Sequence, residues 1–375
     1  MSARAIRCRW RGRPAVVARR HRMGRVLGLA LGLVLGTGCD RTPRFVPASA
    51  DSTAARSPDS LAAHVQQVRA RWETHDREDE VAALTARLVL DDLRLHPRES
   101  IAWRVRTFMD SLTLGAEVMG RSNLAAANFF APSDPAGGSW PYLFWRDDTE
   151  IRHQALEGGG MRLLDLLAQE PDAKASSSSA APGVAVLFAR VAGAGQLPFV
   201  FVWRRASNMG WQLAQSLGAD SLGGVGTARF VAPSPDGVVL VTRTHVPTPR
   251  FDECATCPHV YRTRRFRWGP AGLASAGEQI ERSPYYAFVR FVQALTLSDR
   301  ELANRFAADP TLVDAAEGYE WGRPKGTWRL APGTETRSEH AVYFRGRQEA
   351  YRVHFAARGD DWVITGFEPT SRSIE

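Results

Sequence analysis

The chain has 375 residues, of which 44% are hydrophobic and 23% are charged, a composition typical of a globular protein with two or three domains. Its formal net charge of +8 comes from the segment before Cys39, which contains nine arginines and no acidic residue. The rest of the chain contains 39 of the 48 basic residues and all 40 acidic residues, so it is close to neutral. It lacks the basic excess that nucleic-acid binding needs, and we therefore expect no nucleic-acid partner. The nine residues are Arg4, Arg7, Arg9, Arg11, Arg13, Arg19, Arg20, Arg22 and Arg25.

The first 38 residues have the order of a secretory signal peptide. Residues 1–25 are basic, and residues 26–38 form an apolar run of thirteen residues, VLGLALGLVLGTG. A membrane-spanning helix needs about 20 apolar residues, so this run is too short to span a bilayer but is typical of a signal peptide. The sequence therefore predicts export, with translation starting at Met1 or, for a more compact signal, at Met23.

The apolar run ends in Leu-Gly-Thr-Gly-Cys, residues 35–39. This segment resembles the lipobox of bacterial lipoproteins, in which small residues precede a cysteine that receives diacylglycerol before cleavage. The usual leucine three positions before the cysteine is replaced here by Gly36, and Leu35 lies one position further back. The resemblance implies lipidation at Cys39, and two or more acyl chains such as palmitate attach a protein stably. It also implies a location in the cell envelope, anchored to a membrane on its periplasmic or outer side.

The residues after Cys39 predict a tether followed by a helical region. Residues 40–57 contain Pro, Ser and Ala without an apolar period, as expected of a flexible tether. Residues 58–170 are expected to be mostly helical, with a further short helix after Gly160, because apolar residues recur every three or four positions. Three such stripes each predict one amphipathic helix: Leu61, Val65, Val68 and Trp72; Val81, Leu84, Leu88 and Leu95; Ile101, Val105, Phe108 and Leu112.

Residues 183–282 carry the pattern of an antiparallel β domain. Short runs of β-branched and aromatic residues between turn residues predict five or six strands, in a single sheet, a sandwich or a partial barrel. The run at 260–268 alternates, which places Phe266 on one face and Arg265 and Arg267 on the other. The four arginines of this run, Arg262, Arg264, Arg265 and Arg267, lie on alternating faces and are expected mainly to form a solvated edge that discourages edge-to-edge strand pairing; contact with anionic headgroups is the alternative. The other predicted runs are 184–188, 199–203, 211–217 and 238–242.

Residues 283–375 predict a separate α+β domain. An apolar helix is expected after Ser283-Pro284, then helices at 298–307 and 310–316, and then strands at 327–331, 340–345, 350–357 and 362–367. This order and size resemble the cone-shaped nuclear-transport-factor-2-like fold. The resemblance implies an interior pocket, for which His340, Tyr351 and His354 are the candidate polar residues because they lie on predicted strands.

Besides the lipidated Cys39, two cysteines remain in the predicted mature chain, Cys254 and Cys257, with His259 close by. A disulfide is the leading interpretation, because an exported protein meets oxidising conditions. A zinc site would need a fourth ligand that is absent nearby, and a redox pair would need its first cysteine at a helix N-terminus. Haem attachment requires a histidine at position 258, where this chain has proline.

The remaining sequence contains no pattern that predicts an active site or a cofactor. No Gly-x-Ser-x-Gly elbow occurs, and the glycine-rich stretches lack the Lys-Ser/Thr of a phosphate loop. Residues 232–237 (APSPDG) resemble the end of the calcium loop in integrin-type propeller repeats, but the earlier carboxylates are missing and no calcium is expected.

We therefore expect an α+β protein with a helical segment, a central antiparallel β domain and a C-terminal cone-like domain. The expected function is that of a membrane-anchored envelope lipoprotein, a non-enzymatic module that binds or supports an envelope protein partner. The alternative is a small-molecule-binding or hydrolytic enzyme that uses a pocket in residues 283–375.

Overall fold

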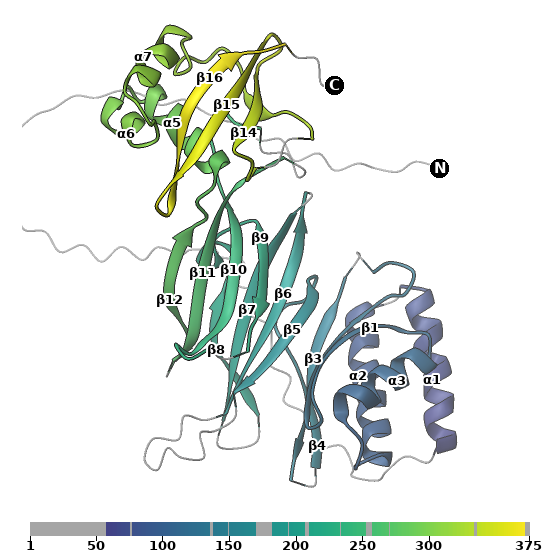
Figure 1. The fold of residues 1–375 in the computed structure, drawn as a ribbon. Coiled ribbons are helices and arrows are strands. Elements are labelled where there is room, and N and C mark those ends of the chain that lie inside the picture. Colours follow the sequence, from purple (N-terminus) through teal and green to yellow (C-terminus); the bar gives the residue numbers. More distant parts are fainter. Residues whose placement is uncertain are drawn as a thin grey trace, which may run out of the picture. The chain divides into compact units, whose positions relative to one another are not determined.

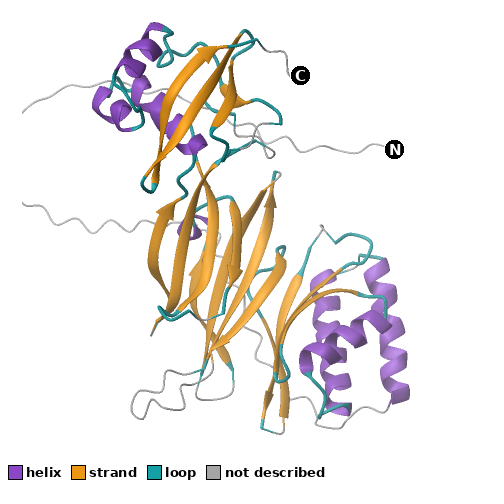
Figure 2. Ribbon diagram, in the orientation of Figure 1, coloured by secondary structure: helices purple, strands orange, loops and turns teal. Residues whose placement is uncertain are grey.

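The structure is a computed structural model, in which seven helices and sixteen strands in four antiparallel sheets confirm the α+β class within the described residues (Figure 1). Every sheet is a four-stranded meander whose strands follow the order of the chain (Figure 2). The predicted signal peptide (1–38) and the lipidated tether (39–57) lie outside the described residues. The described residues are 58–75, 77–135, 138–148, 150–169, 182–193, 195–206, 210–232, 234–252, 257–269, 271–333 and 336–371.

Three helices open the described chain and follow the three predicted stripes, whose residues, such as Trp72 and Val105, are buried. The second helix ends before Pro97, because a proline disfavours the helical conformation in the residue before it. The third helix begins after Ser100, whose hydroxyl accepts a hydrogen bond from the main-chain N–H of Trp103 at 3.4 Å. The helices are α1 (Pro58–Glu73), α2 (Glu78–Leu95) and α3 (Ile101–Ser111).

The prediction that residues 58–170 are mostly helical is wrong beyond Ser111, because five strands follow. The segment 162–169, where a helix was expected, is a strand that pairs along its length with its neighbour at 183–192. Its leucines fit either a helix or a strand, and the pairing partner far along the chain decides between them. The strands are β1 (Gly115–Gly120), β2 (Leu124–Phe130), β3 (Trp140–Asp147), β4 (Glu150–Ala155) and β5 (Arg162–Gln169).

The predicted antiparallel β domain consists of two sheets that pack face to face. The first contains β5 with three strands of the predicted region, and the second contains the next four strands. The members are β6 (Gly183–Ala192), β7 (Gly195–Arg205) and β8 (Trp211–Leu217) in the first, and β9 (Gly226–Phe230), β10 (Val238–Val246), β11 (Val260–Gly269) and β12 (Gly272–Ile280) in the second. A short helix, α4 (Ala219–Leu222), connects the two sheets.

Alternation along the strands builds these elements into layers with shared cores. In β2, Ala125 faces α1–α3, whereas Ala126 faces the β5–β8 sheet. In β6, Val186 contributes to the core shared with β1–β4, whereas Leu187 contributes to the core shared with β9–β12. The β1–β4 and β5–β8 sheets are therefore each buried on two faces. The β9–β12 sheet directs Leu240, Phe266 and Leu273 into the last of these cores.

The C-terminal region has the predicted order of helices before strands. The elements are α5 (Pro284–Thr296), α6 (Arg300–Arg305) and α7 (Thr311–Gly318), then β13 (Trp328–Leu330), β14 (His340–Arg345), β15 (Glu349–Arg358) and β16 (Asp361–Pro369). The hydroxyl of Ser283 accepts a hydrogen bond from the main-chain N–H of Tyr286 at 3.1 Å and caps α5, which Pro284 begins. One face of α5 packs against the sheet in a core of its own.

Contacts near Trp328 fasten this region to the end of the β9–β12 sheet. The main-chain N–H of Trp328 donates to the carbonyl of Arg250 at 2.8 Å, and that of Asp252 donates back to the carbonyl of Trp328 at 2.9 Å. The guanidinium of Arg250 donates to Thr296 Oγ1 and to the carbonyl of Gly322, each at 2.6 Å. These bonds join the segment after β10 to β13 and to the C-terminal end of α5.

Candidate functional site

The anchor predicted from the sequence stays a prediction, because Cys39 lies outside the described residues. None of the described helices is long and apolar enough to cross a membrane.

The three residues proposed to line a C-terminal pocket do not come together. His340 and His354 lie opposite each other on β14 and β15, with ring centroids 6.4 Å apart, and both are exposed. Tyr351 points to the other face of the sheet, where it is buried and donates a hydrogen bond to Glu349 at 2.9 Å. Its burial raises the pKa of Tyr351 to about 12, so its hydroxyl stays protonated.

The inner face of the β13–β16 sheet is filled by aromatic side chains. The rings of Phe288 and Tyr343 stack with centroids 3.8 Å apart, and Phe288 meets Trp328 edge-on at 5.1 Å. Trp321 lies 5.3 Å from Trp328. All four are buried, so the space in which a cone-shaped domain holds a ligand is occupied here by its core.

The cysteine cluster is described in part. Cys257 takes part in a disulfide bond. Cys254 lies outside the described residues, so the pairing of Cys254 with Cys257 stays a prediction. His259 is buried and stacks on His245, with ring centroids 3.8 Å apart. Among the residues that the structure describes, no three His, Cys, Asp or Glu side chains are grouped to hold a metal ion.

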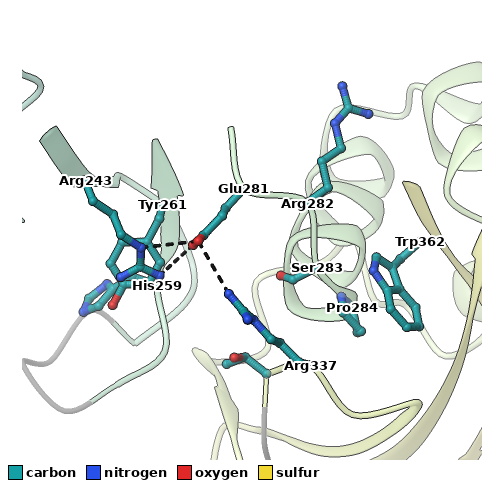
Figure 3. A pocket seen from close by; sticks show the side chains of 10 residues that line it. Arg243, His259, Tyr261, Glu281, Arg282, Ser283, Pro284, Arg337 and Trp362 are labelled. Carbon is teal, nitrogen blue, oxygen red and sulfur yellow. Dashed lines mark hydrogen bonds and ion pairs between the residues drawn. The ribbon is translucent and has the colours of Figure 1, made fainter. Parts of the chain in front are cut away.

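The clearest candidate for a binding site is a cleft between the end of the β9–β12 sheet and the start of α5, which we call the arginine cleft (Figure 3). Its volume is about 290 Å³, near the lower end of the range for small-molecule sites. The sheet, the connection into α5, the loop before β14 and β16 all contribute to it. The lining residues are Arg243, His259, Tyr261, Glu281, Arg282, Ser283, Pro284, Thr336, Arg337 and Trp362.

Glu281 is the only acidic residue of this lining and is shared by two arginines. Arg243 Nη2 lies 2.6 Å from Glu281 Oε2, and Arg337 Nη2 lies 3.6 Å from Glu281 Oε1. The Arg243 guanidinium also covers the ring of Tyr261, 3.3 Å from its centroid. Burial lowers the pKa of Arg243, but the hydrogen bond and charge of Glu281 outweigh this effect and hold it above its ordinary value. Arg243 therefore stays charged at any physiological pH.

The opposite wall contains Arg282, whose guanidinium points away from Glu281 (Figure 3), together with apolar surface. Arg282 pairs with Asp361, and this hydrogen bond raises the pKa of Arg282. Trp362 and Pro284 supply apolar area beside it. The positive end of the α5 dipole is also at this wall, and no acidic residue occupies the first turn of the helix. The wall therefore favours an anion over a cation.

The hydrogen-bond donors of the cleft outnumber the carboxylates that could accept from them. Each guanidinium carries five N–H groups, and Arg243 and Arg337 share the single carboxylate of Glu281, whereas Arg282 pairs with Asp361. The side chain of Arg337 is 76% exposed, and the distance to Glu281 is long for an ion pair. Arg337 can therefore turn toward a bound carboxylate or phosphate, the groups whose geometry matches a guanidinium.

Sequence reasoning did not find this cleft, because its lining comes from segments far apart in the chain. The strand that carries Tyr261 and the start of α5 at Ser283-Pro284 were both predicted. No local pattern indicates that the turn before β14 brings Arg337 to the same place. Comparison with known proteins finds no matching family model, no matching curated protein and no matching solved structure. The chemistry of the cleft is therefore the basis for any inference of function.

Proposed function

We propose that this chain is an exported, lipid-anchored binding protein of the bacterial envelope, with an anionic small molecule or an acidic group of a partner protein as the ligand of the arginine cleft. The lipobox-like sequence at 35–39 and the predicted tether at 40–57 support export and anchoring to a membrane of the envelope. Arg243 and Arg337 converge on Glu281, the one carboxylate of the cleft lining (Figure 3), and this convergence supports the ligand class. This convergence is the observation that carries the binding function.

The described chemistry supports binding rather than catalysis. His259 stacks on His245, and Ser283 caps α5, so neither is arranged as a nucleophile and base pair. The apolar surface of Trp362 and Pro284 suits a ligand with an apolar part beside its acidic group.

The anchor is tested by metabolic labelling with a palmitate analogue in the native host. The wild-type chain is expected to incorporate label and to stay with membranes in 1 M salt, whereas Cys39→Ala is expected to remain unlabelled and unprocessed. Cys257→Ala serves as the control cysteine variant and is expected to be labelled like the wild type. An unlabelled wild-type chain, recovered in solution with its leader intact, would contradict the anchor.

The cleft is tested by calorimetric titration of the purified protein with succinate and with inorganic phosphate. We expect saturable binding that Arg337→Ala weakens by about tenfold, since a hydrogen bond to a charged group contributes at least about 1.5 kcal/mol. Glu281→Gln is expected to strengthen binding, because it removes the carboxylate that competes with the ligand. Opposite effects of two substitutions in one cleft cannot result from a general loss of structure.

The matched control is Arg347→Ala, which removes an exposed arginine on the turn between β14 and β15, away from the cleft lining. It is expected to leave both affinities within a factor of two. Failure of both anions to bind, or an equal loss of affinity with Arg337→Ala and Arg347→Ala, would refute the anionic ligand.

A further inference from the structure

The outer face of the β9–β12 sheet carries four arginines, which we call the arginine face: Arg229, Arg243, Arg265 and Arg267. Val241 on β10 lies opposite Arg229 on one side and Arg265 on the other, and directly opposed residues share a face. Arg267 follows Arg265 by two positions on the same strand and so lies on that face as well. Arg243, two positions after Val241, joins the arginine face to the arginine cleft.

The charges of this face are largely unneutralised. Arg229, Arg265 and Arg267 are exposed, and none of them forms an ion pair with any residue that the structure describes. One opposing charge acts on this face: the pKa of Asp236 is lowered mainly by a hydrogen bond from Ser234 and in part by the charge of Arg265. The body beyond residue 38 is close to neutral, so this concentration of positive charge is local.

The face is also held rigidly in place. On the opposite side of the same strands, Leu240 and Phe266 are buried in the core shared with β5–β8. Arg264, which alternates with the exposed arginines, donates to the carbonyls of Asp220 and Ser221 in α4. The four arginines therefore present a fixed array rather than a set of independent side chains on a loop.

We propose that the arginine face docks the body of this protein onto the anionic phospholipid headgroups of the membrane that holds its anchor. The proposal rests on the proposed function only for bringing the chain to a membrane. Eighteen residues separate Cys39 from Pro58, and a chain of that length spans at most about 60 Å, so a lipidated Cys39 would keep the start of α1 within that distance of the bilayer surface. Guanidinium groups match phosphate in geometry and charge, and a planar bilayer surface can meet several of them at once.

The experiment uses the chain from residue 39 onward with Cys39→Ser, which lacks both the arginine-rich leader and the lipid. All described core residues lie at Leu61 or beyond, in the compact unit Ala54–Glu375, so this chain keeps every core. Its sedimentation is measured with vesicles of phosphatidylcholine alone and with vesicles containing 30 mol% phosphatidylglycerol. We expect preferential binding to the anionic vesicles, lost in 1 M NaCl, where the Debye length falls to about 3 Å.

The test variant carries Arg229→Gln, Arg265→Gln and Arg267→Gln. Each arginine near an anionic surface strengthens partition about fivefold, so the triple variant is expected to bind on the order of 100-fold more weakly. The control variant carries Arg98→Gln, Arg121→Gln and Arg347→Gln, which remove the same charge at exposed arginines of other elements. Both are expected to unfold within a few degrees of the parent chain, because exposed substitutions change stability little.

Three results would overturn the docking surface. The first is equal binding to neutral and anionic vesicles, and the second is an equal loss of binding in the two triple variants. The third is displacement by 10 mM inorganic phosphate or by duplex DNA at constant ionic strength, which would assign these arginines to another ligand. Because this chain carries no lipid, a failed palmitate experiment would refute the anchor and leave the vesicle measurement unchanged.

Discussion

At the scale of single residues, Arg345 shows how a charge can be part of a core. Its side chain has no exposed surface, and its guanidinium donates to the carbonyls of Tyr319, Glu320 and Arg323 at 2.7–3.1 Å. It also pairs with Glu349 at 3.1 Å. These bonds fix the turn after α7 onto β14, and each would leave an unsatisfied acceptor if the guanidinium were removed.

We therefore predict that Arg345→Met lowers the free energy of unfolding by about 3–5 kcal/mol, the cost of leaving a buried partner uncompensated. Arg345→Lys keeps the charge but not the planar set of donors, so its free energy of unfolding is expected to lie between those of Arg345→Met and the wild type. Urea denaturation measures all three. Arg347→Met, two residues away and exposed, is the control and should change stability by less than about 0.5 kcal/mol. A loss below about 1 kcal/mol for Arg345→Met would contradict this role.

The alternation of side chains along a strand also explains why the three residues predicted to line a C-terminal pocket lie on different faces of the sheet. Tyr351 and His354 are three positions apart on β15, and an odd separation on a strand places two side chains on opposite faces. Predicting the strand was therefore enough to separate them. What the sequence could not show is that aromatic residues from α5 and from the segment before β13 fill the inner face.

At the scale of elements, the spacing of apolar residues predicted the helices and strands in which that spacing is regular. The stripes of α1–α3 and the alternation of β11 both reappear as buried faces. Two of the strands that were missed have weak patterns: β12 (GLASAGEQI) is composed largely of small residues, and β2 (LAAANFF) is rich in alanine. Each is a strand because a neighbour supplies the pairing, and such long-range partners cannot be read from local sequence.

The arginine cleft illustrates the same limit. Each of its segments has an ordinary local explanation: a strand end, a helix cap and a turn. Their convergence depends on the bonds around Trp328 and Arg250, which join residues more than 40 positions apart. The sequence predicted arginines along β11. It could not show that the start of α5 and the loop before β14 lie opposite the neighbouring Arg243 and make it part of a cleft.

At the scale of the whole molecule, the shared cores make the layers depend on one another. Both faces of the β1–β4 and β5–β8 sheets contribute side chains to shared cores, so neither sheet is expected to persist once its neighbours are lost. A group buried between two layers can therefore control the stability of all of them. His153 on β4 is partly buried at such a place, because it stacks on Phe144 and Tyr142 in the sheet that α2 covers.

His153 makes the stability of the molecule depend on acid. Burial, assisted by the charges of Arg87 and Arg94, lowers the pKa of His153 to about 4, whereas an unfolded histidine has a pKa of about 6.5. Between pH 6.5 and 4 the unfolded state binds a proton that the folded state does not, so stability falls as the pH falls through this range. The loss attributable to His153 is up to about 3 kcal/mol, and it is complete below about pH 4.

We predict that His153→Gln reduces the difference in unfolding free energy between pH 7 and pH 4, measured by urea denaturation at each pH. His354→Gln, which removes an exposed histidine on β15, is the control and should keep the wild-type difference. Because other titrating groups are common to all three proteins, they cancel when the pH profiles are compared. The same pH dependence in His153→Gln and in the wild type would show that this histidine is protonated in the folded protein and that the helical layer leaves it accessible to water.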